Sequence, residues 1–464
     1  MLTLSRRAGR SVIAPLAAVT LIATALVGCA PDEPVGEETA GPTGLTLDPA
    51  LVEAAHAAAA ASTAGEDLAG GKVTMIGSTA GTDGEWLKTV FGVFQEATGI
   101  EVDYQGTSDV TAIVQTQVQG GNPPDIVQDN SLALLQQYHD SGDLIAIDDF
   151  LDMDVINEQY DATLLQNLSI DGRLYGLPSA VHNMQFWYNT ENLEPPADVT
   201  DFAGLIEWGE AQVADGAPAP LCIGTELGAN TGVLAMLLMD FMFLKNYGPE
   251  KLEQWGRGEL PFQSPEVKSV FEEFLSLFEN DLVYGGADTA LTTPWTQSPA
   301  LLFTDPQSCQ VAPYGSFAPG IIRGQNPDLV AGTDFDYFLL GSENPEWNDA
   351  LLSWGWSTFA LTDTPELQAF VRWYLSPEFQ TLVASTGGWV MANKQIPVET
   401  YPSDIQGAIA SDLQSASALS FGLWSLLPTD VRTSVLEATV TVMRDPAQLD
   451  TQLASLDDLI AARG

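Results

Sequence analysis

Between residues 72 and 127 the chain alternates short apolar segments with amphipathic ones, and this alternation constrains the fold more than any other feature. The apolar segments have the length of buried strands, whereas the amphipathic segments repeat at helical spacing, as Leu87, Val90 and Phe94 do. A strand-helix-strand-helix-strand series predicts an α/β fold with a largely parallel sheet. The expected strands are residues 73–76, 100–104 and 125–127, with helices after residue 84, ending at Gly99, and over residues 108–118.

Two polar loops follow the first and third of these strands, at residues 77–84 and 128–130. Ligands of open parallel sheets bind outside the carboxyl ends of the strands, where these loops would lie. Their small residues, backbone amides and acidic or amide side chains, Asp83, Asp129 and Asn130, suit a ligand rich in hydroxyl groups. The same residues are also consistent with ordinary polar loops and helix caps.

The first 29 residues contain, in this order, a basic segment, an apolar segment, a small-residue segment and a cysteine. Arg6, Arg7 and Arg10 precede the apolar residues 12–27, and the segment ends in LVGC at Cys29. This order resembles a bacterial lipoprotein signal, with cleavage after residue 28 and lipid attached to the Cys29 sulfur. The apolar run is shorter than the roughly 20 residues of a spanning helix, and no later segment is expected to be long and apolar enough to compete with it. A plain secretory signal and an uncleaved anchor are the alternatives.

Residues 29–71 are expected to form a flexible tether, because they are rich in Ala, Gly, Pro, Glu and Thr and contain no aromatic side chain. Residues 51–61 have the composition of an alanine-rich helix, but nothing in them indicates a core. We therefore expect the folded body to begin at about Lys72.

The composition is strongly acidic, with 62 Asp and Glu against 16 Lys and Arg and a formal net charge of −46. Binding to nucleic acid or to anionic lipid headgroups needs clustered cations, so both are excluded as partners. The chain is nevertheless expected to fold, because 45% of its residues are hydrophobic and 11 are tryptophan.

Cysteine and histidine are too rare to indicate a metal site or a cofactor. Apart from Cys29 the cysteines are Cys222 and Cys309, and two thiols left in an exported chain most simply form a disulfide. The three scattered histidines do not complete a zinc or iron site with them. A single surface calcium ion held by carboxylates is possible in so acidic a chain, but none is predicted.

A known family is indicated by residues 171–178 (DGRLYGLP) followed by residues 186–189 (FWYN), with residues 121–126 (GNPPDI) upstream. In this order and spacing they resemble the first inter-lobe crossing of the sugar-binding proteins of ABC importers, the family 1 extracellular solute-binding proteins. The alpha-glucoside-binding subgroup is the most similar over residues 72–460. The motifs that carry this are residues 221–226 (LCIGTE), 259–262 (ELPF), 285–287 (GGA), 291–294 (LTTP), 305–306 (DP) before Cys309, and 316–320 (SFAPG).

The resemblance implies a two-lobed periplasmic-binding-protein fold of the class II type, with discontinuous lobes joined by a three-segment hinge. One lobe would comprise residues 72–186 with 336–388, and the other residues 187–335 with 389–464. Residues 387–390 (GGWV) would form the third crossing, and Cys222 would pair with Cys309. The implied protein is a monomer on the outer face of the cytoplasmic membrane, attached to the membrane only through its lipid, with permease subunits and a carbohydrate ligand as partners.

A sugar site needs aromatic platforms for the C–H faces of the ring and carboxylates or amides for its hydroxyl groups. By position in the family pattern, Asp129 and Glu226 would accept hydroxyl hydrogen bonds, while Trp295, Phe317 and Trp389 would stack. The full expected set is Asp83, Asp129, Asn130, His182 or Asn183, Glu226, Trp295, Phe317 and Trp389.

Three other tryptophans, Trp187, Trp354 and Trp356, are expected in the core because apolar strand residues surround them. The chain departs from the family after residues 427–428 (LP), where no aromatic residue follows. Trp424, just before this turn, is the candidate substitute.

Other functions remain open at this stage. A polyol, a β-linked sugar or a glycerol phosphodiester are alternative ligands, the last disfavoured because the expected site holds no Arg or Lys. An exported carbohydrate-active enzyme is the alternative from another class, since 62 acidic residues include many possible catalytic pairs. No nucleophile-elbow or P-loop motif is present, so a serine hydrolase and a nucleotide-binding subunit are disfavoured.

Overall fold

The computed structural model describes residues 47–107, 109–129, 131–195 and 199–463, apart from the side chains of Thr82 and Asp83. The strands are β1 (Lys72–Gly77), β2 (Glu101–Gly106), β3 (Ile126–Asp129), β4 (Ser169–Ile170), β5 (Arg173–Leu174), β6 (Gly176–Asn189), β7 (Ala219–Leu221), β8 (Cys309–Gly315), β9 (Phe335–Phe338), β10 (Ala350–Ala360) and β11 (Ala418–Phe421).

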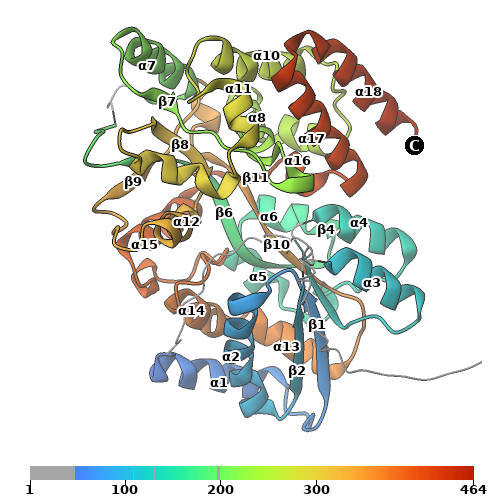
Figure 1. Cartoon of the computed structure of the whole chain (residues 1–464). Helices are drawn as coiled ribbons and strands as arrows, with labels where there is room; N and C mark the ends of the chain where they lie inside the picture. Colours follow the sequence, from blue (N-terminus) through green and yellow to red (C-terminus); the bar gives the residue numbers. More distant parts are fainter. Residues whose placement is uncertain (1–46, 108, 130, 196–198, 464) are drawn as a thin grey trace, which may run out of the picture. The chain divides into compact units, whose positions relative to one another are not determined.

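The α-helices surround the sheet that most of these strands form (Figure 1). They are α1 (Pro49–Ser62), α2 (Gly81–Thr98), α3 (Val110–Gln119), α4 (Leu132–Ser141), α5 (Met153–Gln159), α6 (Ala162–Asn167), α7 (Phe202–Ala214), α8 (Val233–Tyr247), α9 (Pro249–Gly256), α10 (Pro265–Glu279), α11 (Gly286–Thr292), α12 (Ala318–Gln325), α13 (Pro365–Tyr374), α14 (Pro377–Ser385), α15 (Asp404–Ser415), α16 (Leu423–Leu426), α17 (Thr429–Arg444) and α18 (Leu449–Ala461).

The α/β class is confirmed, and the first three strands pair as their sequence predicts. β1 lies between β2 and β3 and is parallel to both. The loop before α2 is shorter than expected, because the helix already begins at Gly81. Gly99 ends α2 in the left-handed conformation, with φ 72°.

The sheet as a whole is mixed, which corrects the expectation of a largely parallel one. Its nine strands follow the order β2-β1-β3-β10-β6-β8-β7, with β11 added to β10 and β9 added to β6. β10 is antiparallel to both β3 and β6, and β6 is antiparallel to β8 and β9. The antiparallel pairs involve strands far apart in the sequence, so the local strand-helix alternation did not indicate them.

The two longest strands, β6 and β10, join the two halves of this sheet (Figure 1). The first half of β6 pairs with β10 through residues 176–183, and its second half pairs with β8 and β9 through residues 184–189. β10 in turn pairs with β3 through residues 357–360 and with β11 through residues 350–353. The carboxyl ends of β1 and β3 and the residues after β7 and β8 therefore meet on either side of the middle of β6 and β10.

A packed helix replaces part of the expected tether. α1 carries Ala55 and Ala59 fully buried, and it packs on α2, α13 and α14 (Figure 1). The Trp373 indole donates to the Ala55 carbonyl at 2.9 Å, and Arg372 donates to the Ser62 carbonyl at 3.2 Å. The folded body thus begins before Lys72. Residues 29–46, with the proposed lipid-bearing Cys29, lie outside the described residues.

The stretch that contains α8 has the composition of a membrane-spanning helix but is packed like a core helix. Residues Gly228–Tyr247 are the one stretch of the described chain long and apolar enough to cross a membrane. The expectation that no segment after the signal has this composition was therefore wrong. Of that stretch, 78% is buried, and α8 packs against α9, α10 and β10.

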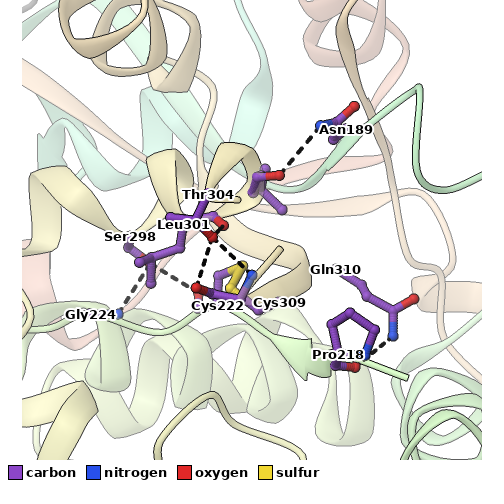
Figure 2. Close-up of a disulfide and its surroundings, with 11 residues drawn as sticks. Asn189, Pro218, Cys222, Gly224, Ser298, Leu301, Thr304, Cys309 and Gln310 are labelled. Carbon is purple, nitrogen blue, oxygen red and sulfur yellow. Dashed lines mark hydrogen bonds between the residues drawn. A yellow bond between two sulfur atoms is a disulfide. The ribbon is translucent and has the colours of Figure 1, made fainter. Parts of the chain in front are cut away.

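The predicted disulfide is confirmed, with Cys222 and Cys309 joined and their Cα atoms 5.3 Å apart (Figure 2). It links the residue after β7 to the first residue of β8, which is parallel to β7. Beside it, the buried Ser298 hydroxyl donates to the Cys222 carbonyl at 2.9 Å and accepts from the Gly224 N–H at 3.1 Å. These bonds anchor the loop that leads from β7 to Glu226.

The packing of α1 predicts a sharp contrast between two alanines of the same helix. Ala59→Asp would bury a charge against α2 and should lower the free energy of unfolding by at least about 2 kcal/mol. Ala57→Asp, on the exposed face, should lower it by less than about 1 kcal/mol. Urea unfolding of both variants measures this. Equal stability would mean that α1 does not pack on the body.

Candidate functional site

The carboxyl ends of β1 and β3 lie side by side and bring Ser78 next to Asp129. The Ser78 N–H donates to the Gln128 carbonyl at 3.1 Å. The Asp129 carboxylate is oriented by the Ser131 N–H at 2.8 Å, and its carbonyl accepts from Ser357 at 3.0 Å. Asp129 is half-buried, so its carboxylate is held in place and still partly open to solvent. This is the arrangement expected of a group that accepts hydrogen bonds from a ligand.

A continuous row of aromatic rings passes beside Ser78 and crosses the middle of the sheet. The Trp356 indole donates to the Ser78 hydroxyl at 3.0 Å. Neighbouring ring centroids in the row are separated by 5.0 to 5.7 Å. We call this set the aromatic row, and its members in spatial order are Trp86, Trp389, Trp356, His182, Phe317 and Trp295.

Only some rings of the aromatic row present a surface. Trp389 is 2% exposed and Trp295 is 5% exposed, so in this conformation they support the row from within. Phe317 and Trp356 are half-buried and can offer part of a ring face. These two rings are therefore the best-placed platforms for a pyranose.

Trp356 corrects one sequence expectation. Trp187 and Trp354 are buried, at 0% and 5% exposed, as predicted, whereas Trp356 lies in the aromatic row. The pairing of β10 with β6 shifts register between Gly355 and Ser357, and such a bulge turns a side chain to a new direction. A glycine inside a strand pattern is the signal that could have indicated the bulge.

His182 holds the centre of the row as a neutral ring. It is 8% exposed, its Nδ1 lies 3.3 Å from the Ser316 hydroxyl, and its plane is steeply inclined to the rings of Phe317 and Trp356, at 78° and 72°. Burial lowers the pKa of His182 to about 4. The imidazole is therefore uncharged at neutral pH. Its neighbour Asn183 is fully buried, and its amide oxygen lies 3.4 Å from the Gln185 amide nitrogen.

Glu226 joins the far end of the row through the backbone. Its carbonyl accepts from the Trp295 N–H at 2.9 Å, and its N–H donates to the Thr293 carbonyl at 3.0 Å. One oxygen of its carboxylate accepts from the Gly228 N–H at 3.0 Å. The structure thus carries a second oriented carboxylate at the Trp295 end.

A cavity of about 340 Å³ opens where His182 and Phe317 meet. It continues between α12 and α15 and is floored by Gly387, Gly388 and Val390. The Val390 carbonyl accepts from the Val181 N–H at 3.0 Å, so this floor runs beside β6. Its volume lies within the range of about 300 to 1,000 Å³ that is usual for small-molecule sites.

A cation near Asp129 was missed by the sequence analysis. The guanidinium of Arg432, on α17, lies 4.4 Å from the Trp424 ring and donates to the Trp424 carbonyl at 2.8 Å. Burial lowers the pKa of Arg432, and the charge of Asp129 partly offsets this. Arg432 is thus within electrostatic reach of Asp129, although 303 residues separate them in sequence order. Only the fold could reveal this pair.

The turn that carries Trp424 is held by a buried carboxyl group. Asp240, on α8, is 0% exposed and accepts from the Leu423 N–H at 3.0 Å. Burial raises the pKa of Asp240 well above its usual value, and the backbone N–H groups of Leu423 and Trp424 oppose this. A Cβ at Gly422 would lie 2.3 Å from the Asp240 carboxylate, so only glycine fits there. Asp240 therefore determines where Trp424 and its partner Arg432 sit.

Two further residues, Asp83 and Asn130, were expected in the site. Asp83 lies in the first turn of α2, near the Ser78 loop, and Asn130 lies outside the described residues. Within the described part of the chain, no group of His, Cys, Asp and Glu is arranged to hold a metal ion.

Comparison with known proteins shows the family to which the chain belongs. The family model described as bacterial extracellular solute-binding protein matches residues 91–406. The osmoprotective compounds-binding protein GgtB of Synechocystis sp. is 26% identical over 370 residues, covering 78% of this chain and 86% of GgtB. The alpha-glucosides-binding periplasmic protein AglE of Rhizobium meliloti is 26% identical over 382 residues, covering 78% of this chain and 81% of AglE.

Solved structures share the fold. The bacterial solute receptor AcbH, whose structure is described with a substrate preference for β-D-galactopyranose, superposes with a TM-score of 0.69. Its sequence is 17% identical, and the match covers 84% of this chain and 98% of AcbH. This likeness identifies the two-lobed solute-binding fold and carries no information on the ligand.

The buried imidazole of His182 predicts a pH dependence of stability. Between pH 6.5 and 4 the unfolded chain protonates this histidine while the folded chain does not, so the free energy of unfolding falls as the pH falls. Relative to His182→Gln, the wild type should lose about 2.5 kcal/mol between pH 7 and pH 4.5. Urea unfolding at both pH values measures the difference. A constant difference would show that His182 titrates normally.

The Asp240 cap predicts different outcomes for two substitutions. Asp240→Leu removes the acceptor of the Leu423 and Trp424 N–H groups and should lower the free energy of unfolding by about 2 to 4 kcal/mol. Asp240→Asn keeps an acceptor oxygen and should stay within about 1 kcal/mol of the wild type. Guanidinium unfolding compares them. If both variants were equally stable, the carboxyl group would not hold the turn.

Proposed function

Because this chain belongs to the family of bacterial extracellular solute-binding proteins, we propose that it captures a carbohydrate outside the cytoplasm for an ABC importer. Its partners would then be the sugar and the permease subunits, to which it delivers the ligand. In this proposal the protein is a monomer held at the outer face of the membrane by a lipid on Cys29.

One observation carries the proposal of a sugar ligand. The half-buried rings of Phe317 and Trp356 both contact His182. The Ser357 hydroxyl, one residue after Trp356, donates to the carbonyl of Asp129, whose carboxylate is oriented by the Ser131 N–H. A pyranose presents C–H faces to aromatic rings and hydroxyl groups to carboxylates, so it matches both parts of the site. The second carboxylate, Glu226, and the buried rings of Trp295 and Trp389 extend the same chemistry.

The proposed ligand is an alpha-glucoside or a short alpha-linked oligosaccharide. The motifs at residues 221–226 and 316–320 support it, as does the similarity to a relative named for binding alpha-glucosides. Polyols and β-linked sugars are the alternative ligands. A glycerol phosphodiester was disfavoured because the expected site held no Arg or Lys, and Arg432 removes that reason. Asp129, which interacts with Arg432, would still repel a phosphate group.

We further propose that binding closes two lobes around the sugar. The first lobe comprises residues 72–186 with 336–388, to which α1 adds residues 49–62, and the second comprises residues 187–335 with 389–464. A ligand that contacts both lobes stabilises the closed state by its greater affinity for that state. Capture rather than cleavage is the proposed activity, since the relatives are named as binding proteins.

A panel of sugars tests the proposal. A ligand at about 100 times its Kd adds roughly 2.7 kcal/mol to the free energy of unfolding and should raise Tm by several degrees. We expect this rise with maltose, trehalose, sucrose or maltodextrins, smaller or no rises with polyols and β-glucosides, and recovery of the sugar intact. No shift with any sugar would exclude a carbohydrate receptor, and a consumed sugar would indicate an enzyme.

Asp129→Asn should weaken the affinity for the sugar so identified by about tenfold to a hundredfold, because a carboxylate acceptor forms the stronger hydrogen bonds. Asp67→Asn, at an exposed position before β1 and thus at the amino end of that strand, is the matched control and should leave Kd unchanged. Isothermal titration calorimetry measures both. Unchanged affinity in a folded Asp129→Asn protein would remove Asp129 from the site.

A further inference from the structure

We infer that Asn167 forms a polar clamp between the two proposed lobes, away from the candidate site, and that this clamp controls how long the protein holds its ligand. Asn167 is the last residue of α6, in the first lobe. Its partners in the clamp, Glu253 and Arg257, belong to α9 and its C-cap, in the second lobe. This rests on the proposed function, from which the two lobes and their closure are taken.

The Asn167 side chain is 4% exposed, and each of its polar atoms has a partner. Its amide nitrogen donates to the Glu253 carboxylate at 3.0 Å and to the Thr163 carbonyl at 3.1 Å. Its amide oxygen accepts from the Arg257 guanidinium at 2.8 Å. The bond to Thr163 holds the amide on α6, while both bonds to the second lobe have a charged partner. Such bonds are stronger than those between neutral groups.

The clamp is sheltered by close packing of the surrounding elements. α6 and α9 both contact β11, and α9 also contacts α16. A Cβ at Gly256 of α9 would lie 2.6 Å from the Leu426 side chain of α16, so the two helices approach closely. Burial raises the pKa of Glu253, and Asn167 and Arg257 oppose this. Hydrogen bonds shielded from water in this way are stronger than the same bonds at the surface.

The clamp can open without leaving a charge unpaired. Glu253 precedes Arg257 by four residues, and Arg257 keeps helical backbone angles, with φ −88° and ψ 0°. This is the spacing and the order at which an acidic and a basic side chain of one helix attract each other. If the lobes separated, these two side chains could pair directly, and Asn167 would keep its bond to Thr163. The clamp therefore shifts an equilibrium between two satisfied states.

The clamp is made in a conformation whose lobes also touch at the candidate site. α4 of the first lobe contacts α16 of the second, and Arg432 of the second lobe is within electrostatic reach of Asp129 of the first. We take this as the closed arrangement. Bonds made only in that arrangement stabilise it relative to the open one and so slow the release of an enclosed sugar.

Three variants isolate the clamp. Asn167→Ala removes it from the first lobe, and Glu253→Ala weakens it from the second, at a half-buried position. Asn246→Ala is the matched control, because Asn246 of α8 donates to Glu273 of α10 at 2.9 Å, a bond of the same kind inside one lobe. Asn167→Ala should fold, since Glu253 and Arg257 can still pair with each other.

The experiment has one readout without sugar and one with it, both on the full chain. By small-angle X-ray scattering, sugar-free Asn167→Ala should have a larger radius of gyration than the wild type. By stopped-flow tryptophan fluorescence with maltose and trehalose, its dissociation rate should rise about tenfold while its association rate does not fall. Adding Glu253→Ala to Asn167→Ala should change the dissociation rate by less than about twofold. Asn246→Ala should match the wild type throughout.

A radius of gyration equal to that of the wild type would overturn the inference, and so would an unchanged dissociation rate. A reduced association rate would indicate a distorted sugar site instead of a lost clamp. Effects of Asn167→Ala and Glu253→Ala that simply added would show that these residues do not act on each other. If Asn167→Ala failed to fold, Glu253→Ala alone would give the same two readouts. A wild type that bound no sugar would overturn the proposed function, and the scattering would still decide whether the clamp holds the lobes together.

Discussion

The antiparallel pairing of β6 with β10 is the interaction on which the rest of the molecule depends. Each strand pairs with different partners at its two ends, so the two halves of the sheet are joined through shared strands. The middle of this pair carries His182 and Trp356. Asp129, the last residue of β3, accepts from Ser357 beside Trp356, and Phe317, in the segment after β8, contacts His182. Any change in the register of β6 and β10 would move every part of the candidate site.

The sequence predicted local structure well and the long-range structure only in part. The alternation of residues 72–127 indicated β1 to β3 and their helices. In the motif at residues 171–178, Asp171 and Gly172 form the two-residue turn between β4 and β5, with φ angles of 52° and 77°. The mixed sheet was not predicted, because its antiparallel pairs join distant segments. α1 was taken for part of the tether because its buried face is alanine, which gives almost no hydrophobic pattern.

The same distinction holds for the site. Phe317, His182 and Trp295 were expected from their motifs, and they lie in one aromatic row. Trp356 was assigned to the core from its apolar neighbours. The bulge in β10 next to it turns its ring in a direction that strand periodicity does not indicate. Arg432 was not considered, since its proximity to Asp129 arises only when α17 packs in place. Chemistry carried by one short motif is visible in sequence, whereas chemistry shared between distant helices and strands is not.

The aromatic row also gives the molecule an optical property of its own. Trp86, Trp389 and Trp356 come from α2, the segment after α14 and β10, and their neighbouring centroids are 5.0 Å apart. Indole rings this close couple electronically, so their near-ultraviolet circular dichroism depends on the angles between them. A movement of these segments against one another would rotate the coupled transitions. The protein thus contains an intrinsic chromophore array that reports its conformation without any attached label.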